Sequence, residues 1–196
     1  MSSRSSSRTT DPATARLSNL VGAWALAISD RMDRAVEVSA GRGSQAPAAL
    51  VALHQFADGS TIEELRRVLG LSHSAAVRLI DGLVSDGHVT REPAAQDRRS
   101  VALTLTPSGR ATARRIAAAR QRAIATTLEG LTHAELRALT RLAERLTADV
   151  VSLRLDERRE GATPPGGWLC RLCDFQACGR SDGRCPAATI AAANHS

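Results

Sequence analysis

Lysine and tyrosine are absent from this 196-residue chain, and only two tryptophans and two phenylalanines are present. So few aromatic side chains disfavour recognition of single-stranded nucleic acid or RNA, which needs several exposed rings on which bases stack. All the basic side chains except histidine are arginines, and the formal net charge is +6. A positive balance points to an acidic partner, such as nucleic acid or an anionic membrane surface.

Long apolar runs are missing as well. The opening residues, 1–11, are polar and serine-rich, and neither a secretory signal nor a membrane-spanning stretch follows them. We therefore expect a disordered N-terminal tail on a soluble, cytoplasmic protein with no membrane association. The sequence also has no glycine-rich phosphate loop, no nucleophile elbow and no histidine placed to activate a cysteine. These absences predict that the protein is not an enzyme.

Helical periodicity dominates what is present. Apolar residues recur at spacings of three and four from residue 12 to about residue 38, and a leucine-rich edge runs from Leu136 to Leu153. Between these long helices, Thr61 and Glu64 have the spacing of a capping box that opens a short helix ending at Gly70. The next helix begins after Ser72, and a connection this short forces the two helices to cross steeply. This pattern predicts a helix-turn-helix.

The spacing of apolar residues changes to alternation after Gly87. Residues 88–92 and 100–106 alternate around a polar tip, with Val101, Leu103 and Leu105 expected on one side. Thr106 and Pro107 then supply the start of another helix. A helix-turn-helix followed at once by a β-hairpin predicts a mainly α-helical winged helix-turn-helix, in which the helix-turn-helix and wing occupy about residues 60–106.

Each part of this arrangement has a physical role on double-stranded DNA. The second helix can enter the major groove, where Arg78 can bond the edge of a guanine at two points. The hairpin tip places Arg98 or Arg99 at the minor groove, whose negative potential attracts guanidinium groups. Seven arginines stand against six acidic residues between positions 60 and 110, so placement rather than bulk charge must carry binding. The candidate contacts on the helix are Ser72, His73, Ser74 and Arg78.

The segment DRRSVALTLTPSGR, residues 97–110, resembles the wing of MarR-type regulators. IEELRRVLGLSHSAAVRLIDGLVSDGHVTRE, residues 62–92, is similar to the helix-turn-helix that precedes the wing in that family, and the resemblance covers roughly residues 12–155. It implies that Asp97 orients the wing, that Arg99 reaches the minor groove, and that the first and last helices are dimerisation helices. The implied function is a homodimeric, sequence-specific transcriptional regulator, expected to be a repressor on an inverted repeat and open to a small-molecule effector. The alternative is an adaptor that docks proteins through the same elements without binding DNA.

All four cysteines lie within the last thirty residues, in the spacing C-x2-C-x4-C-x6-C. Four soft ligands within sixteen residues predict one structural zinc ion, with no open coordination position for catalysis. An iron–sulfur cluster and metal-free redox thiols remain alternatives, and loss of metal or thiol oxidation is a hypothetical signal to the DNA-reading heads. Neighbouring arginines can offset the charge of a tetrathiolate site, and Trp168 and Phe175 can cover it. The candidate ligands are Cys170, Cys173, Cys178 and Cys185.

The predicted organisation follows from these boundaries. It comprises a tail (1–11), a winged-helix and dimerisation domain (12–155), a linker rich in glycine and proline (156–167), a cysteine-rich knuckle (168–188) and a second tail (189–196).

Overall fold

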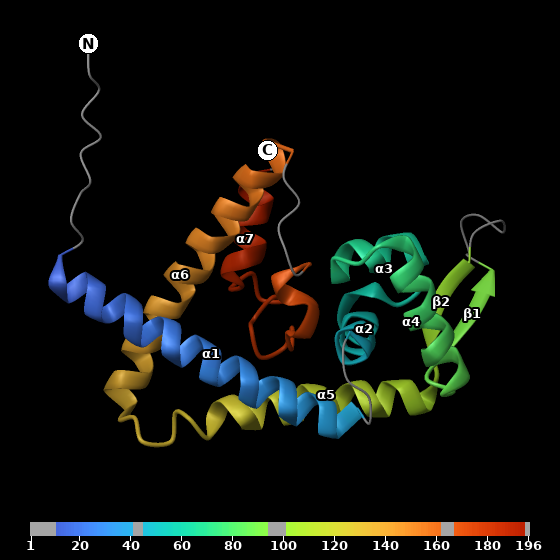
Figure 1. Ribbon diagram of the computed structural model, residues 1–196, viewed down its shortest axis with the longest axis horizontal. Helices are drawn as coiled ribbons and strands as arrows, with labels where there is room; N and C mark the ends of the chain where they lie inside the picture. The colour runs from blue at the N-terminus through green and yellow to red at the C-terminus, as the bar shows by residue number, and fades with distance from the viewer. Residues whose placement is uncertain (1–10, 41–44, 94–100, 162–166, 195–196) are drawn as a thin grey trace, which may run out of the picture.

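The computed structural model describes residues 11–40, 45–93, 101–161 and 167–194. Helices α1 and α6 extend to one side, α2 to α4 and the hairpin gather on the other, and α5 runs beneath both groups (Figure 1). The predicted mainly helical winged helix-turn-helix is confirmed. The elements are α1 (Pro12–Ala40), α2 (Ala46–Ala52), the π-helical turn η1 (Leu53–Ala57), α3 (Ile62–Leu69), α4 (His73–Ser85), β1 (Val89–Pro93), β2 (Val101–Leu105), α5 (Pro107–Ala125), α6 (His133–Arg159), the 3-10 turn η2 (Leu169–Leu172) and α7 (Pro186–Ala193).

The turn between α3 and α4 is built by capping side chains. The Thr61 backbone N–H donates to a Glu64 carboxylate oxygen at 2.8 Å, and the Glu64 N–H donates back to the Thr61 hydroxyl at 3.2 Å. Gly70 ends α3 in the left-handed conformation, at φ 68°, which glycine adopts without a Cβ penalty. Ser72 then caps α4 by accepting the N–H of Ala75. Local hydrogen bonds therefore fix both ends of the turn, as the sequence predicts.

The core lies where α4 and the hairpin meet α2, α3 and α5. Ile80 and Leu83 of α4 are completely or almost completely buried, and so are Leu50 of α2 and Leu53 of η1. Val77 and Val84, which helical spacing places on the same face of α4, are half-buried. This apolar face of α4 therefore packs on the core, and the opposite face is exposed.

The hairpin pairs β1 with β2 in antiparallel register, from Val89 opposite Leu105 to Pro93 opposite Val101. Leu103 and Leu105, expected on one side of β2 together with Val101, are buried, whereas Val101 at the first position of the strand is 43% exposed. Ala102, expected on the other side, is also buried. It forms a β-bridge with Thr61, so the chain leading into α3 runs along the edge of β2.

The start of α5 is fitted closely against the turn that precedes β1. Thr106 caps α5 and also donates its hydroxyl to the Gly87 carbonyl oxygen at 2.7 Å. Gly109, in the first turn of α5, leaves no room for a side chain, since a Cβ there would lie 2.0 Å from the His88 carbonyl oxygen. This contact sets the position of the hairpin on the long helix.

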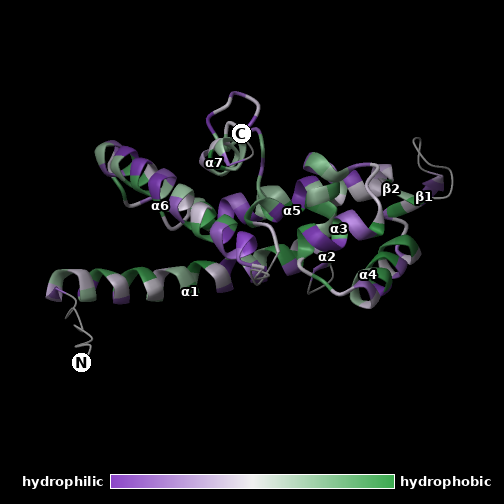
Figure 2. Cartoon of the chain, turned by 90° about the horizontal axis from the view of Figure 1, so that it is seen from above, coloured by the Kyte–Doolittle hydropathy of each residue, from purple (hydrophilic) through white to green (hydrophobic). Residues whose placement is uncertain are grey.

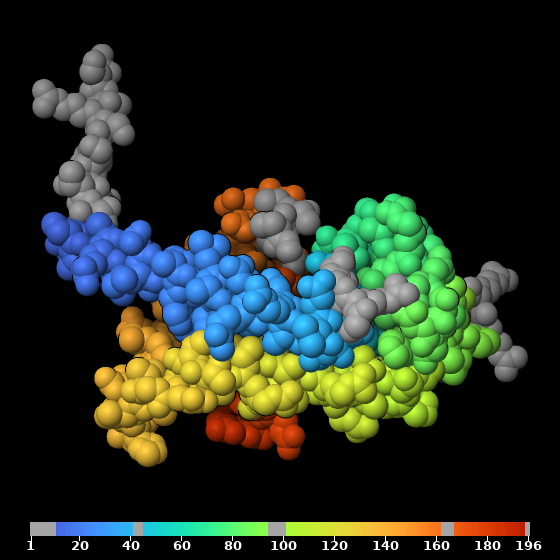
Figure 3. Space-filling model, turned by 60° about the horizontal axis from the view of Figure 1, so that its bottom comes forward, coloured from blue at the N-terminus to red at the C-terminus, as the bar shows by residue number. Residues whose placement is uncertain are grey.

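The two long helices carry apolar faces that one chain does not cover. The second half of α1 packs lengthwise on α5 (Figure 3), whereas its first half projects away from the other helices (Figure 2). No residue of α6 is buried within the chain. The side chains left 43–62% exposed are Leu17, Leu20, Val21 and Trp24 on α1 and Leu142, Leu146, Val150 and Leu153 on α6. Among the described residues, no helix is long and apolar enough to cross a membrane.

Candidate nucleic-acid interface and cysteine segment

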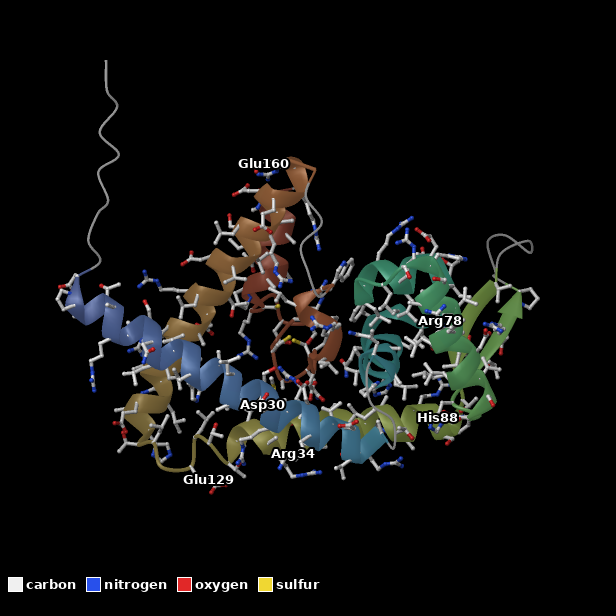
Figure 4. All side chains as sticks on the ribbon, viewed as in Figure 1. Asp30, Arg34, Arg78, His88, Glu129 and Glu160 are labelled. Carbon is white, nitrogen blue, oxygen red and sulfur yellow. The ribbon has the colours of Figure 1, made fainter. Side chains whose placement is uncertain are left out.

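The first turns of α4 bring the predicted recognition residues together on one free surface. Ser72, His73, Ser74 and Arg78 are all exposed. The Ser72 hydroxyl caps the helix and lies 3.3 Å from the Ser74 hydroxyl, so these two side chains have defined positions. Arg78 follows a turn later on the same helix (Figure 4). The arrangement presents hydroxyl, imidazole and guanidinium groups at the N-terminal part of one helix.

Arg78 differs from the arginines around it. Arg66 and Arg67 both pair with Glu63, at 2.5 Å and 3.0 Å, and therefore stabilise α3 rather than face outward freely. Arg78 pairs with no carboxylate within the described part of the chain. Its guanidinium group thus keeps all its donors for a ligand, and five donors in a planar fork suit the edge of a base or a phosphate.

An ion pair that the sequence did not reveal joins the hairpin to α4. Arg91 of β1 lies 2.6 Å from Asp81 of α4, and both side chains are substantially exposed. The ion pair links the first strand of the wing to the candidate recognition helix. Because the partners are ten residues apart on different elements, no local spacing in the sequence predicts it.

The wing-tip candidates Asp97, Arg98 and Arg99 lie outside the described residues. The strands on either side of them are described, and their ends, Pro93 and Val101, are paired. The three side chains themselves remain candidates from the sequence.

A short helix pair, an exposed N-terminal face on its second helix and an adjoining hairpin define a winged helix-turn-helix protein. Residues 41–100 match the family model described as MarR family. Together with the fold, this match confirms the resemblance to MarR-type regulators that the sequence indicates. A regulator of this type also agrees with the prediction that the protein is not an enzyme.

Solved structures share this fold. A MarR family protein from Bacillus stearothermophilus matches with a TM-score of 0.62 and 23% identity, over 72% of this chain and 98% of that one. The reduced form of MarR from E. coli matches with a TM-score of 0.54 and 26% identity, over 64% and 94%. A mutant of MepR from S. aureus, bound to an oligodeoxyribonucleotide, matches with a TM-score of 0.53 and 18% identity, over 68% and 97%.

The cysteine segment, residues 168–188, contains four free thiols. The Cys173 thiol donates to the Leu169 carbonyl oxygen at 4.0 Å, and the Cys178 thiol donates to the Phe175 carbonyl oxygen at 3.5 Å. Interaction with the Cys173 thiol, together with burial, raises the pKa of Cys170 above its usual range. The same interaction lowers the pKa of Cys173 to about 6, an effect that the nearby positive charges of Arg120 and Arg171 reinforce. Burial raises the pKa of Cys178.

Each cysteine also interacts electrostatically with thiols beyond its nearest partner. Cys185 raises the pKa of Cys170, and both Cys185 and Cys173 raise the pKa of Cys178. We call Cys170 with Cys173, and Cys178 with Cys185, the two pairs of thiols. Over the described ranges of the chain, however, no three histidine, cysteine or acidic side chains already stand close enough to form a metal site. The sequence predicts that all four thiols form one metal site. In the structure, Cys170 interacts with Cys173 and Cys178 with Cys185.

Aromatic side chains hold the cysteine segment against the helix-turn-helix unit. Phe56 of η1 stacks on Trp168, with ring centroids 5.9 Å apart, and on Phe175, at 5.1 Å, and both pairs of rings are nearly parallel. The Arg180 guanidinium carbon lies 4.7 Å from the centre of the Phe175 ring. We call Trp168, Phe56, Phe175 and Arg180 the aromatic stack. The sequence predicts Trp168 and Phe175 as cover for the thiols, but it does not reveal Phe56 as their partner.

Backbone contacts complete the docking of the segment. The Trp168 N–H donates to the Val68 carbonyl oxygen in the last turn of α3 at 2.7 Å. Gly167, at φ 72°, makes this approach possible, because a Cβ there would lie 2.4 Å from the same oxygen. The Phe175 N–H donates to the side-chain oxygen of Gln55 at 3.1 Å. The segment is therefore hydrogen-bonded to η1 and to the end of α3.

The other side of the segment is attached to α6, which continues four residues past the predicted domain boundary, to Arg159. Arg154 donates to the Gly167 carbonyl oxygen at 3.0 Å, and Arg159 hydrogen-bonds to Asn194 at the end of α7. Helix α7 packs along α6 and spans the predicted boundary between knuckle and tail. The cysteine segment therefore lies between α6 on one side and η1 and α3 on the other (Figure 1).

Proposed function

We propose that the protein is a homodimeric, sequence-specific DNA-binding repressor that acts in the cytoplasm on an inverted-repeat operator. The observation that carries this proposal is the free N-terminal face of α4, with an unpaired arginine beside a hairpin. A major groove admits an α-helix, and the minor groove next to it attracts a guanidinium group. The S. aureus structure with the same fold was solved with an oligodeoxyribonucleotide bound, which supports DNA as the partner.

Dimerisation supplies the second half of the proposal. The uncovered apolar faces of α1 and α6 lie on the side of the molecule away from α4 and the hairpin, so pairing through them leaves both recognition helices free. Two such helices about 34 Å apart match successive turns of the major groove. A dimer placed over a promoter represses by excluding the polymerase.

The test selects duplexes from a random-sequence library and then compares arginine variants on the selected DNA. We expect an inverted repeat, and we expect Arg78→Ala to weaken its binding by about tenfold or more, since a good bidentate base contact is worth roughly 1–3 kcal/mol. Arg122→Ala is the matched control, because Arg122 is exposed near the other end of α5 and its loss removes the same charge. Fluorescence anisotropy at several salt concentrations supplies the affinities.

Two outcomes would contradict this function. Equal affinities for the Arg78 variant and the native protein would mean that α4 does not read DNA, and they would favour the protein-docking adaptor. Failure to enrich any duplex at low ionic strength would remove DNA as the partner altogether.

A further inference from the structure

We propose that the four cysteines bind one zinc ion and that this ion, through the aromatic stack, fixes the helix-turn-helix unit on α6 in the orientation that binds DNA. The DNA-binding part of this inference rests on the proposed function, whereas the zinc site and its effect on α3 do not. On binding, each coordinating thiol gives up its proton to solvent, and the four thiolates and Zn²⁺ form a tetrahedral complex.

The surroundings of the thiols suit such a complex. Four thiolates around Zn²⁺ carry a net charge of about −2. Arg120 and Arg171 act electrostatically on Cys173, and Arg180 acts on Cys170, so positive charge from α5 and from the segment itself faces the thiols. The Arg180 backbone N–H and the Cys178 thiol both donate to the Phe175 carbonyl oxygen, at 3.1 Å and 3.5 Å, which holds Cys178 in place.

Two glycines allow the second pair of thiols to turn toward the first. Gly179 and Gly183 have φ values of 67° and 70°, and the Arg184 N–H donates to the Gly179 carbonyl oxygen at 2.9 Å, which folds the chain between Cys178 and Cys185. The first pair is held by η2, where the Cys173 N–H donates to the Cys170 carbonyl oxygen at 3.0 Å. Each pair is thus preformed, and an ion that draws the two pairs together uses both turns without unfolding either.

The coupling to DNA reading follows from what the ligands are joined to. Phe175 lies between Cys173 and Cys178 in the sequence, and its ring stacks on Phe56 while its N–H bonds to Gln55. Trp168, two residues before the first cysteine, stacks on the other side of Phe56 and bonds to the end of α3. The rings flanking the thiols therefore both stack on a residue of η1, the segment that leads into the helix-turn-helix. When both pairs of thiols bind one zinc ion, Trp168 and Phe175 are held more firmly against Phe56.

The expected consequence is higher affinity for DNA in the zinc-bound protein. A helix-turn-helix unit fixed on α6 loses less conformational freedom when it binds, so less of the binding free energy is spent on ordering. Coupling between two sites typically changes affinity by about 5-fold to 150-fold, and we expect a change of at least about fivefold here.

The first experiment measures the metal site without DNA. Full-length protein is prepared reduced and metal-free, titrated with ZnCl₂, and analysed for zinc after desalting. We expect one zinc per chain, and we expect Cys170→Ser and Cys185→Ser to lose it. Co²⁺ in place of zinc should show the visible absorption of a tetrahedral thiolate complex. A protein that retains no zinc, that is isolated brown with iron and sulfide, or whose serine variants keep full zinc overturns the site.

The second experiment measures the coupling by hydrogen–deuterium exchange of α3 with and without zinc. We expect slower exchange over residues 62–71 in the zinc-bound protein, because the Trp168 contact holds the end of α3. Trp168→Leu removes the ring that stacks on Phe56 and should keep one zinc per chain while abolishing this slowing. Trp168→Phe retains a stacking ring and should restore it. Unchanged exchange in the native protein on zinc addition overturns the coupling.

The third measurement uses the selected duplex. Zinc should strengthen its binding by the native protein and by Trp168→Phe, and should leave the affinity of Trp168→Leu unchanged. An unchanged or lowered affinity of the native protein overturns the regulatory part. If the native protein binds no duplex at all, the proposed function fails, and the exchange measurement alone decides whether zinc is coupled to α3.

Discussion

Gly109→Ala is expected to lower the free energy of unfolding by about 3 kcal/mol or more, although alanine is the better helix former. The added Cβ would lie 2.0 Å from the His88 carbonyl oxygen and 3.1 Å from the side chain of Leu105. The first obstacle is backbone, which cannot rotate aside, so either α5 or the turn before β1 must move. The resulting displacement breaks the hydrogen bonds that Thr106 makes to that turn.

Thermal unfolding followed by circular dichroism at one fixed protein concentration measures this effect. For a chain of this length, the expected loss corresponds to a fall in Tm of roughly 6–12 °C. Gly130→Ala is the matched control, since a Cβ at Gly130 meets nothing within 4 Å and the residue has no positive φ. A Tm for Gly109→Ala equal to that of the control would show that α5 does not approach the hairpin as closely as described.

Leu146→Glu is expected to convert the proposed dimer into monomers and to weaken binding to the selected duplex by about 100-fold or more. Leu146 is 59% exposed within one chain and lies in the middle of the apolar edge of α6, where a partner chain would bury it. A buried unpaired carboxylate is strongly unfavourable. Separate monomers each bind a half-site without the gain from linkage, which reaches roughly 10²–10⁴ for paired sites.

Light scattering after size exclusion gives the mass, and anisotropy gives the affinity. Thr140→Glu introduces the same charge at an exposed position on a different face of α6, and it should leave both quantities unchanged. A Leu146 variant that remains a dimer with native affinity would place the dimer interface elsewhere.

The parts of the fold that the sequence predicts are those set by neighbours along the chain. Thr61 with Glu64 and Thr132 with Glu135 form the capping boxes that their spacing indicates, and both carboxyl groups have lowered pKa values because they accept hydrogen bonds from these threonines. Gly70 and Ser72 mark the turn for equally local reasons. The exposed face of α4 follows directly, because the opposite face carries the apolar stripe.

Contacts between residues far apart in the sequence could not be predicted from the sequence pattern. Alternation groups Val101 with Leu103 and Leu105, but it gives no sign that Thr61 bridges to Ala102 along the edge of β2. Phe56 looks like the last apolar residue of a short helix, and only the fold shows it enclosed by rings from residues 168 and 175. The cysteine spacing suggested a site, whereas its attachment to α3 and α6 depends on contacts more than ten residues apart.

The positions of the two tryptophans give the chain built-in optical reporters. Trp24 lies on the uncovered face of α1, and Trp168 lies in the aromatic stack. Since tyrosine is absent, nearly all intrinsic emission comes from these two indoles. Replacing Trp24 by phenylalanine leaves a protein whose fluorescence follows the cysteine segment alone, and replacing Trp168 leaves one whose fluorescence follows self-association. A change in either process can thus be timed by stopped flow without attaching a dye.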